Sequence, residues 1–141
     1  MTLTIGKVAN LVSVSTDTLR YYERQKLIDP ASKSTNGYRL YDQDAVRRIR
    51  FIKHAQHCGF TLTEIRALLA LRASNAACCR DIRKLALEKK LQLEAKVKAM
   101  KVMSKALDHL IVSCSDESGP LDHCPILAAL DRGQGVKEKR R

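Results

Sequence analysis

The chain has 141 residues, a formal net charge of +11 and a hydrophobic content of 45%, with few aromatic residues and no Trp. This length predicts one small domain or a domain with an appended helix, and the low content of Gly and Pro favours a mainly helical fold. So basic a chain favours a polyanionic partner. With no signal peptide and no apolar run of about 20 residues, nucleic acid is favoured over a membrane and we expect a cytoplasmic protein.

The first 26 residues predict two short helices joined by a tight turn. Residues 5–12 form one helix, with Thr4 as a candidate N-cap, and residues 17–26 form the next, capped by Ser15 or Thr16. Two short helices with this connection are typical of a helix-turn-helix.

Residues 29–41 change character and predict a small wing of two strands. This stretch is rich in turn residues, Asn36-Gly37 is a strong hairpin signal, and residues 38–41 alternate as a strand does. Residues 42–57 then show helical spacing, and Thr61 with Glu64 forms a capping box that opens a further helix.

Residues 79–113 predict one long helix, because they contain no Gly or Pro. Apolar residues recur along it with heptad spacing, and a helix of this length needs a partner. An antiparallel pair of identical helices is the simplest solution, so we expect a homodimer. Its expected interface residues are Leu93, Val97, Met100, Leu107 and Ile111.

These patterns divide the chain into four expected parts. Residues 1–75 form a winged helix-turn-helix, and residues 76–113 form the dimerisation helix. Residues 114–132 form a loop and a short helix that begins at Pro125. Residues 133–141 form a flexible basic tail.

The cysteines are odd in number, which argues against a disulfide framework in a cytosolic chain and leaves metal ligation or redox sensing open. Cys79 and Cys114 lie at opposite ends of the long helix, about 50 Å apart at 1.5 Å per residue. If two copies pair antiparallel around Val97, Cys79 of one chain lies beside Cys114 of the other, and the loop returns Cys124 to the same place. Three thiolates suit zinc, cadmium, lead or mercury.

The remaining candidate ligands have weaker support. His123 adjoins Cys124 and can ligate through its imidazole, and Cys78 is either a ligand, a spare thiol or a neighbour that tunes Cys79. Cys58 precedes Gly59 at a helix end, and we expect it to be a small buried hydrophobe.

Basic and phenolic residues gather on the predicted helix-turn-helix and wing, in a combination that suits contacts to phosphates. Further cations follow on the helix of residues 42–57. The set consists of Arg20, Tyr21, Tyr22, Arg24, Lys26, Tyr38, Arg39, Tyr41, Arg47, Arg48, Arg50 and Lys53.

Three motifs at this spacing resemble the MerR family of bacterial regulators along the whole chain. They are residues 18–23 (TLRYYE), residues 36–41 (NGYRLY) and Gly59-Phe60 before the capping box. The segment 124–130 (CPILAAL) is similar to the zinc-responsive branch of that family.

The resemblance implies a mainly α fold with a winged helix-turn-helix, an antiparallel dimerisation helix and a C-terminal metal-binding loop. It also implies a regulator that acts on RNA polymerase indirectly, because the metal-bound dimer untwists an overlong promoter spacer and so activates genes such as those for metal export. The second helix would enter the major groove of double-stranded DNA from Ser15. The implied DNA-binding residues are Ser15, Thr16, Thr18, Arg20, Tyr21, Asn36, Gly37, Tyr38, Arg39 and Tyr41.

The resemblance also bears on the metal, for which Zn(II) is the first expectation. A Cys at position 79 marks the sensors of divalent ions, whereas copper(I) sensors carry Ser there and a shorter Cys-to-Cys loop. The zinc-responsive members carry a second Cys at the place of Ser115 and a His at the place of Gly119. Their absence leaves a sulfur-dominated set that Cd(II) or Pb(II) would also tolerate.

Three other classes of function compete with a metal-responsive regulator. One is a purely architectural DNA binder, whose promoter response would be unchanged by alanine at Cys114. An enzyme of thiol redox chemistry would need a motif such as Cys-x-x-Cys, which is absent, and no other cluster of nucleophile and base stands out, so we expect no enzymatic activity. A redox-sensing regulator would share the DNA-binding half but would respond to oxidants through cysteine pairing.

Overall fold

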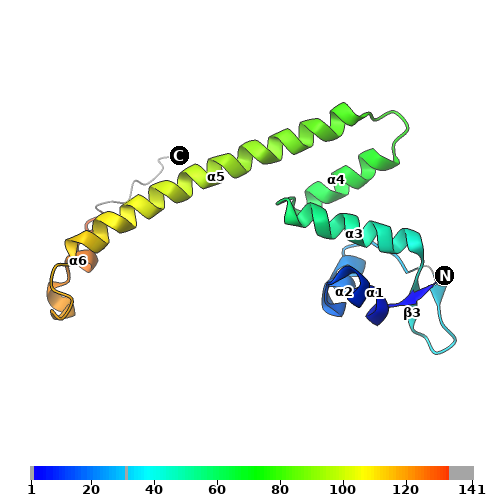
Figure 1. The fold of residues 1–141 in the computed structure, drawn as a ribbon, viewed down its shortest axis with the longest axis horizontal. Coiled ribbons are helices and arrows are strands. Elements are labelled where there is room, and N and C mark those ends of the chain that lie inside the picture. Colours follow the sequence, from blue (N-terminus) through cyan, green and yellow to red (C-terminus); the bar gives the residue numbers. More distant parts are fainter. Residues whose placement is uncertain (1, 31, 134–141) are drawn as a thin grey trace. The chain divides into compact units, whose positions relative to one another are not determined.

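The computed structural model describes residues 2–30 and 32–133, which divide into two compact units at the junction of Lys89 and Lys90. The first unit holds the small sheet and helices α1 to α4, together with the start of α5 (Figure 1). The second unit holds the rest of α5 and the C-terminal segment. The expected tail of residues 133–141 lies outside the described residues except for Gly133.

The predicted helix-turn-helix is present at the N-terminus. Helix α1 spans Ile5–Val12 and α2 spans Thr16–Arg24, and the two helices pack against each other. Ser15 caps α2, since its side chain accepts a hydrogen bond from the backbone N–H of Thr18. Thr4 occupies the N-cap position of α1, but its side chain makes no capping hydrogen bond.

The predicted two-stranded wing is present within residues 29–41, and a third strand from the N-terminus, which the sequence analysis missed, joins its sheet. Strand β3 (Arg39–Tyr41) lies between β1 (Leu3–Thr4) and β2 (Ser32–Lys33), and both pairings are antiparallel. The missed strand has only two residues and runs directly into α1, so no alternation could reveal it. It ties the wing to the first helix of the helix-turn-helix.

The wing hairpin turns on the predicted glycine. The backbone N–H of Gly37 donates to the carbonyl of Ser34 at 2.9 Å, and Gly37 has a φ of 81°. This left-handed conformation is what the hairpin needs and what glycine adopts without steric cost. The turn therefore projects Asn36 and Tyr38 into solvent beside α2.

Helices α3 (Gln43–His57) and α4 (Leu62–Ala73) complete the first unit. Asp42 caps α3, and the predicted capping box between Thr61 and Glu64 opens α4. Apolar side chains from both helices and from the helix-turn-helix form one core. Its most deeply buried members are Val8, Leu19, Tyr22, Leu27, Ile28, Tyr41, Val46, Ile49, Ile52 and Ile65.

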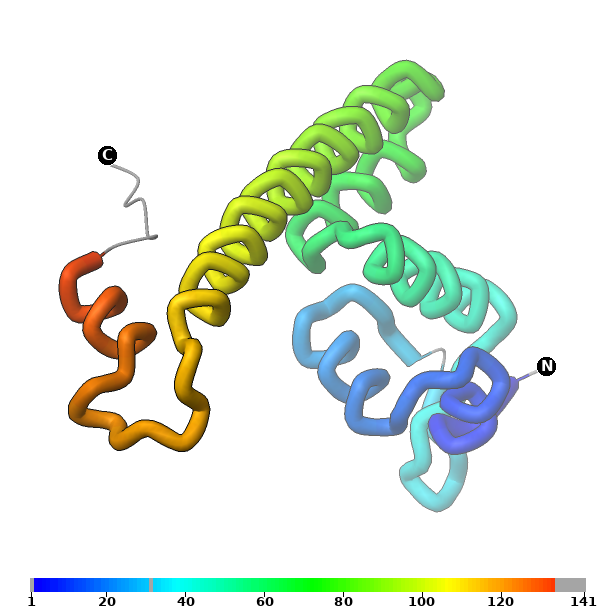
Figure 2. The backbone as a smooth tube through the Cα atoms, turned by 60° about the vertical axis from the view of Figure 1, so that its left-hand side comes forward, coloured from blue at the N-terminus to red at the C-terminus, as the bar shows by residue number. Residues whose placement is uncertain are grey.

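Helix α5 spans Cys79–Ser113, the bounds that the sequence predicted. After it, the chain passes through a loop and a short 3-10 helix at Leu121–His123 into α6 (Pro125–Asp131). Figure 2 shows this segment turning back beside the C-terminal end of α5. No helix in the described part of the chain combines the length and the apolarity that a membrane span requires.

Candidate nucleic-acid interface and metal ligands

Helix α2 presents a polar face to solvent and buries the opposite face. Leu19 and Tyr22 enter the core, whereas Arg20, Tyr21 and Arg24 remain exposed. The Arg24 guanidinium lies over the ring of Tyr21, 5.8 Å from its centre. Two guanidinium groups and a phenol are thus available on one helix face, as expected for contacts to a phosphate backbone.

The predicted residues at the start of α2 lie at the surface or close to it. Ser15 is exposed, and Thr16 and Thr18 are partly exposed. The hydroxyls of Ser15 and Thr18 are hydrogen-bonded to each other at 2.8 Å. The N-terminal turn of α2 therefore offers small hydroxyl groups, which can donate to phosphates or to base edges.

The wing adds a second polar surface beside α2. Gly37 and Tyr38 are exposed, and Arg39 forms an ion pair with Glu23 of α2. The Arg39 side chain is 48% exposed, whereas that of Glu23 is 9% exposed. Sequence spacing alone could not reveal this pair, because its members lie 16 positions apart on different elements.

The prediction that Tyr41 contacts DNA is not supported by its position. Its side chain is completely buried in the core, and its hydroxyl has no hydrogen-bond partner among the described residues. Successive side chains of a strand point to opposite faces, so Leu40 and Tyr41 lie on different faces of β3. The pairing of β1 with β3 fixes which of these faces turns inward. Tyr41 therefore belongs to the packing of the wing.

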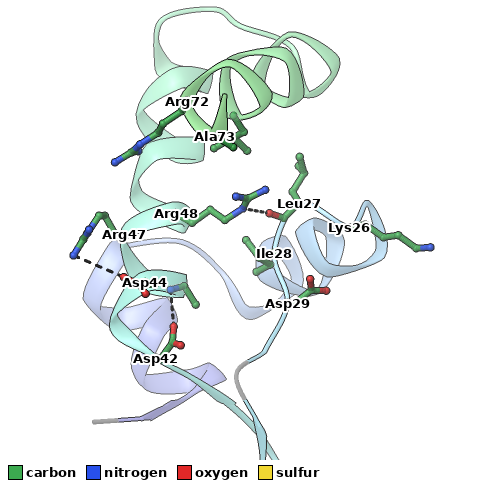
Figure 3. Close-up of a pocket in the computed structure, with 12 residues that line it drawn as sticks. Lys26, Leu27, Ile28, Asp29, Asp42, Asp44, Arg47, Arg48, Arg72 and Ala73 are labelled. Atoms are coloured by element: carbon green, nitrogen blue, oxygen red, sulfur yellow. Dashed lines mark hydrogen bonds and ion pairs between the residues drawn. The ribbon is translucent and has the colours of Figure 1, made fainter. Parts of the chain in front are cut away.

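Cations of α3 that looked available for phosphates bind backbone carbonyls instead. The Arg48 Nε donates to the carbonyl of Leu27 at 2.5 Å, as Figure 3 shows, and the Lys53 Nζ donates to the carbonyl of Val12 at 2.7 Å. Each accepting carbonyl lies at the end of a helix or in the turn after it, where carbonyls lack helical partners. Through these two hydrogen bonds α3 is joined to the helix-turn-helix, although Arg48 remains exposed and Lys53 partly exposed.

A third side-chain contact joins α4 to the end of α2. Arg66 donates through Nη2 to the backbone carbonyl of Gln25 at 2.5 Å and to its side-chain oxygen at 3.2 Å. Arg47 pairs with Asp44 at 3.9 Å, and both side chains are well exposed (Figure 3). The basic residues of α2 and the wing are therefore exposed, whereas α3 and α4 carry side chains that anchor other segments as well as exposed ones such as Arg47.

The start of α5 is tied to α4 by a contact that sequence reasoning missed. The Lys89 ammonium lies 2.8 Å from a carboxylate oxygen of Glu64, and the Lys89 side chain is 7% exposed. The Lys89 hydrogen bond lowers the pKa of the Glu64 carboxyl, helped by the backbone N–H of Thr61. The same carboxylate thus closes the capping box and anchors α5.

The cysteines proposed as metal ligands are accessible but are spread along the chain. Cys79 is the first residue of α5 and is exposed, and Cys78 beside it is exposed as well. The backbone N–H of Cys78 donates to a carboxylate oxygen of Asp81 at 2.8 Å, which fixes the first turn of α5.

The other candidate ligands belong to the second unit. Cys114 follows the last residue of α5, Cys124 is the N-cap residue of α6, and both are partly exposed. His123 is exposed at the end of the 3-10 helix. Within the described residues of one chain, no three His, Cys, Asp or Glu side chains are grouped to hold a metal ion.

The prediction that Cys58 is buried was wrong. It is the C-cap residue of α3 and is exposed, because Gly59, at φ 90°, turns the chain away directly after it. A thiol at a helix end is buried only where another element covers that end, which the sequence of the helix itself does not determine.

Comparisons with known proteins agree with this architecture. The family model "MerR HTH family regulatory protein" matches residues 3–71, and the model "MerR, DNA binding" matches residues 46–110. The HTH-type transcriptional regulator ZntR of Escherichia coli K12 is 33% identical over 135 residues, which cover 94% of this chain and 96% of that protein.

Two further relatives have names that mention a metal. The mercuric resistance operon regulatory protein of Bacillus cereus is 36% identical over 130 residues, which cover 92% of this chain and 98% of that protein. The crystal structure of the regulator PbrR691 from Ralstonia metallidurans CH34, in complex with lead(II), is 31% identical. Its TM-score is 0.79, and the match covers 91% of this chain and 98% of that one.

These matches extend over the helix-turn-helix, the wing and α5, so they concern the whole architecture and not one motif. The relatives are transcriptional regulators and not enzymes, in agreement with the expectation from the sequence. The chain belongs to the MerR family of helix-turn-helix transcriptional regulators.

Proposed function

We propose that this protein is a cytoplasmic, homodimeric regulator that binds promoter DNA and activates metal-resistance genes when it binds Zn(II). The observation that carries the proposal is the joint presence of an exposed basic helix-turn-helix and accessible cysteines at both ends of α5. The mercury and lead relatives support a metal as the signal. The proposed parts are residues 1–75 for DNA, 76–113 for dimerisation and 114–132 for metal.

DNA binding is proposed for the exposed surface of α2 and the wing. A net charge of +11 favours a polyanion, and each cation that neutralises a phosphate releases condensed counterions. Replacing Arg20 by Ala should weaken DNA binding. It should also reduce the dependence of the affinity on salt by the amount that about one phosphate contact contributes. The proposed residues are Ser15, Thr16, Thr18, Arg20, Tyr21, Asn36, Gly37, Tyr38 and Arg39, without Tyr41.

Dimerisation is proposed through an apolar stripe on α5, which we call the α5 stripe and define as Leu93, Val97, Met100, Leu107 and Ile111. All five side chains are between 39% and 63% exposed in the single chain. Such a stripe with heptad spacing is stabilised by a second helix, and the long α5 of another copy provides one of matching length.

Metal binding is proposed for Cys79 of one protomer together with Cys114 and Cys124 of its partner, in an antiparallel dimer. Thiolates of this number suit a soft divalent ion, and His123 or Cys78 can supply a fourth donor. Ligands drawn from two chains make the geometry of the dimer depend on the ion, which is what a sensor requires. When bound, the ion supplies a cross-link between the two protomers.

The proposed response acts on the promoter and reaches RNA polymerase only through the DNA. The metal-bound dimer holds its site in a distorted, untwisted form that brings the promoter elements into register. A second candidate signal is Cd(II), Pb(II) or Hg(II), and the lead complex and the mercuric relative favour it.

The first test is an anaerobic titration of the reduced full-length protein with Zn(II), Cd(II) and Pb(II) against chelators of known affinity. Tight zinc binding that is lost in Cys79→Ser, Cys114→Ser and Cys124→Ser, but kept in the control Cys58→Ser, supports the zinc proposal. Weak zinc binding with tight cadmium or lead binding favours the second candidate.

A promoter assay separates metal sensing from two rivals. The three cysteine variants should keep DNA binding and lose metal-induced transcription, because their helix-turn-helix is unchanged. Induction by an oxidant that is reversed by a reductant without metal would identify a redox sensor. Cysteine variants that no longer bind DNA would indicate that the cysteines are structural.

A further inference from the structure

The ion pair between Arg39 and Glu23 is the side-chain link between the wing and the DNA-facing helix. Arg39 lies on β3 and Glu23 on the last turn of α2. The other described ion pairs of α2 and α3 join residues three positions apart on one helix, at Arg20–Asp17 and Arg47–Asp44. The pair thus fixes one element against another, which the local pairs cannot do.

The two partners of this ion pair differ in burial, so Glu23 is the fixed partner that positions Arg39. The Glu23 side chain is 9% exposed, so its charge is largely removed from water, whereas Arg39 remains about half exposed. A guanidinium has five N–H donors, so Arg39 can bind Glu23 with one side and keep other donors for a ligand. Because a buried carboxylate needs a partner, Glu23 holds Arg39 in one orientation.

The orientation of Arg39 matters because it lines a cleft with other cations. Arg20 and Arg24 of α2, together with Gly37, Tyr38 and Arg39 of the wing, surround a surface cleft of about 430 Å³. Three guanidinium groups around one cleft repel one another unless a nearby negative charge offsets them. Glu23, which does not itself line the cleft, supplies that charge through its ion pair with Arg39.

We propose that Glu23 is a positioning residue for DNA binding, which holds Arg39 and the wing so that Arg39 contacts a phosphate together with the arginines of α2. This proposal rests on the proposed DNA-binding function. It assigns a productive role to an acidic residue in a surface that must bind a polyanion. Removal of a negative charge from a DNA-binding surface ordinarily tightens DNA binding, whereas neutralising Glu23 should weaken it.

That sign can be measured against a matched acidic residue on the same helix. Asp17 pairs with Arg20 at 3.3 Å, and its side chain is 92% exposed, so it only reduces the positive charge of the surface. Asp17→Asn should tighten DNA binding, because it removes a negative charge and frees Arg20. Glu23→Gln removes the same charge but should weaken binding, because Arg39 loses its orienting partner.

The experiment compares full-length wild type, Asp17→Asn and Glu23→Gln on a duplex that the wild type selects from a random-sequence pool, over a range of salt concentrations. Glu23→Gln should weaken binding about tenfold. It should also make the negative slope of log K against log salt less steep by about 0.9, which corresponds to one lost phosphate contact. A merely less stable protein would have a smaller active fraction but an unchanged slope.

The Arg39→Gln background decides whether the effect passes through Arg39. In that background Glu23→Gln should change neither the slope nor the affinity further, and the amide pair of the double variant keeps the buried site hydrogen-bonded. Overturning results are a Glu23→Gln protein that binds as tightly as Asp17→Asn, an unchanged slope, or a full Glu23→Gln effect without Arg39. If the wild type selects no duplex, both this proposal and the proposed DNA binding are wrong. If it does select one, the variants test only the proposed role of Glu23.

Discussion

The two units of the chain differ in what they do with their apolar side chains. In the part of the chain that the structure describes, the first unit places its aliphatic residues in one core, where Leu19, Ile49 and Ile52 are completely buried. In the second unit only Leu110 and Ala129 are buried hydrophobics, and most large apolar residues of α5 are exposed.

The difference indicates that the two units have different sources of stability. The first unit removes apolar side chains from water in its own core, and this burial stabilises a fold by roughly 25 cal/mol for each Å². The second consists mainly of one helix and a short returning segment, and an isolated helix gains little without a packed face. Its ordered state should therefore depend on a partner that covers the α5 stripe.

The largest effect is expected from a cavity in the core of the first unit. Ile49→Ala should lower the free energy of unfolding by about 2–5 kcal/mol, because Ile49 is completely buried on α3. Urea denaturation followed by circular dichroism measures it. Val112→Ala, at a side chain that is 81% exposed, is the control and should cost less than about 0.5 kcal/mol. Equal effects at both sites would remove the contrast between the units.

A charge in the α5 stripe should break the dimer and leave the core of the first unit intact. Val97→Glu puts two like charges opposite each other at the expected two-fold axis, at a cost of several kcal/mol. Sedimentation velocity should show a monomer at concentrations where the wild type is a dimer. The near-ultraviolet circular dichroism of the tyrosines, all of which lie in the first unit, should remain. A Val97→Glu dimer as strong as the wild type would place the interface elsewhere.

A smaller effect is expected where a cation binds a helix end. Lys53→Met keeps the aliphatic stem but removes the 2.7 Å hydrogen bond to the carbonyl of Val12, which should lower stability by about 1–2 kcal/mol. Lys98→Met, at an exposed lysine of α5, is the matched control and should change it by less than about 0.5 kcal/mol. Thermal melts of both variants provide the measurement. Equal melting temperatures would mean that Lys53 does not anchor α1.

The smallest effect is expected in the acid dependence of stability. The pKa of Glu64 is lowered in the folded state from its ordinary value of 4.5 by Lys89 and Thr61. The ionised carboxyl therefore stabilises the fold fully above about pH 4.5, and this contribution is lost as the pH falls through the lower folded pKa. Glu64→Gln should be less stable by about 1 kcal/mol at pH 7 and should converge with the wild type in acid. A constant difference at every pH would exclude this linkage.

Local patterns in the sequence were sufficient for most elements of the fold. Helix α5 has the bounds that its lack of Gly and Pro predicted, and the capping box at Thr61 and Glu64 is formed as expected. These features depend on residues within one or two helical turns, so neighbouring sequence contains the information. The DNA-facing residues of α2 and the cysteines were likewise chosen from residue type and spacing, and their roles stay predictions.

The tertiary structure decided where individual side chains go. Tyr41 is buried although it resembles its exposed neighbour Tyr38 in chemistry, and Arg39 is paired with an acid 16 positions away. Arg48 and Lys53 donate hydrogen bonds to backbone carbonyls of distant segments, which their place on α3 did not reveal. Each outcome depends on which distant segment packs against the residue. Composition and periodicity therefore determined which elements form, whereas long-range packing determined which charges remain free to meet DNA.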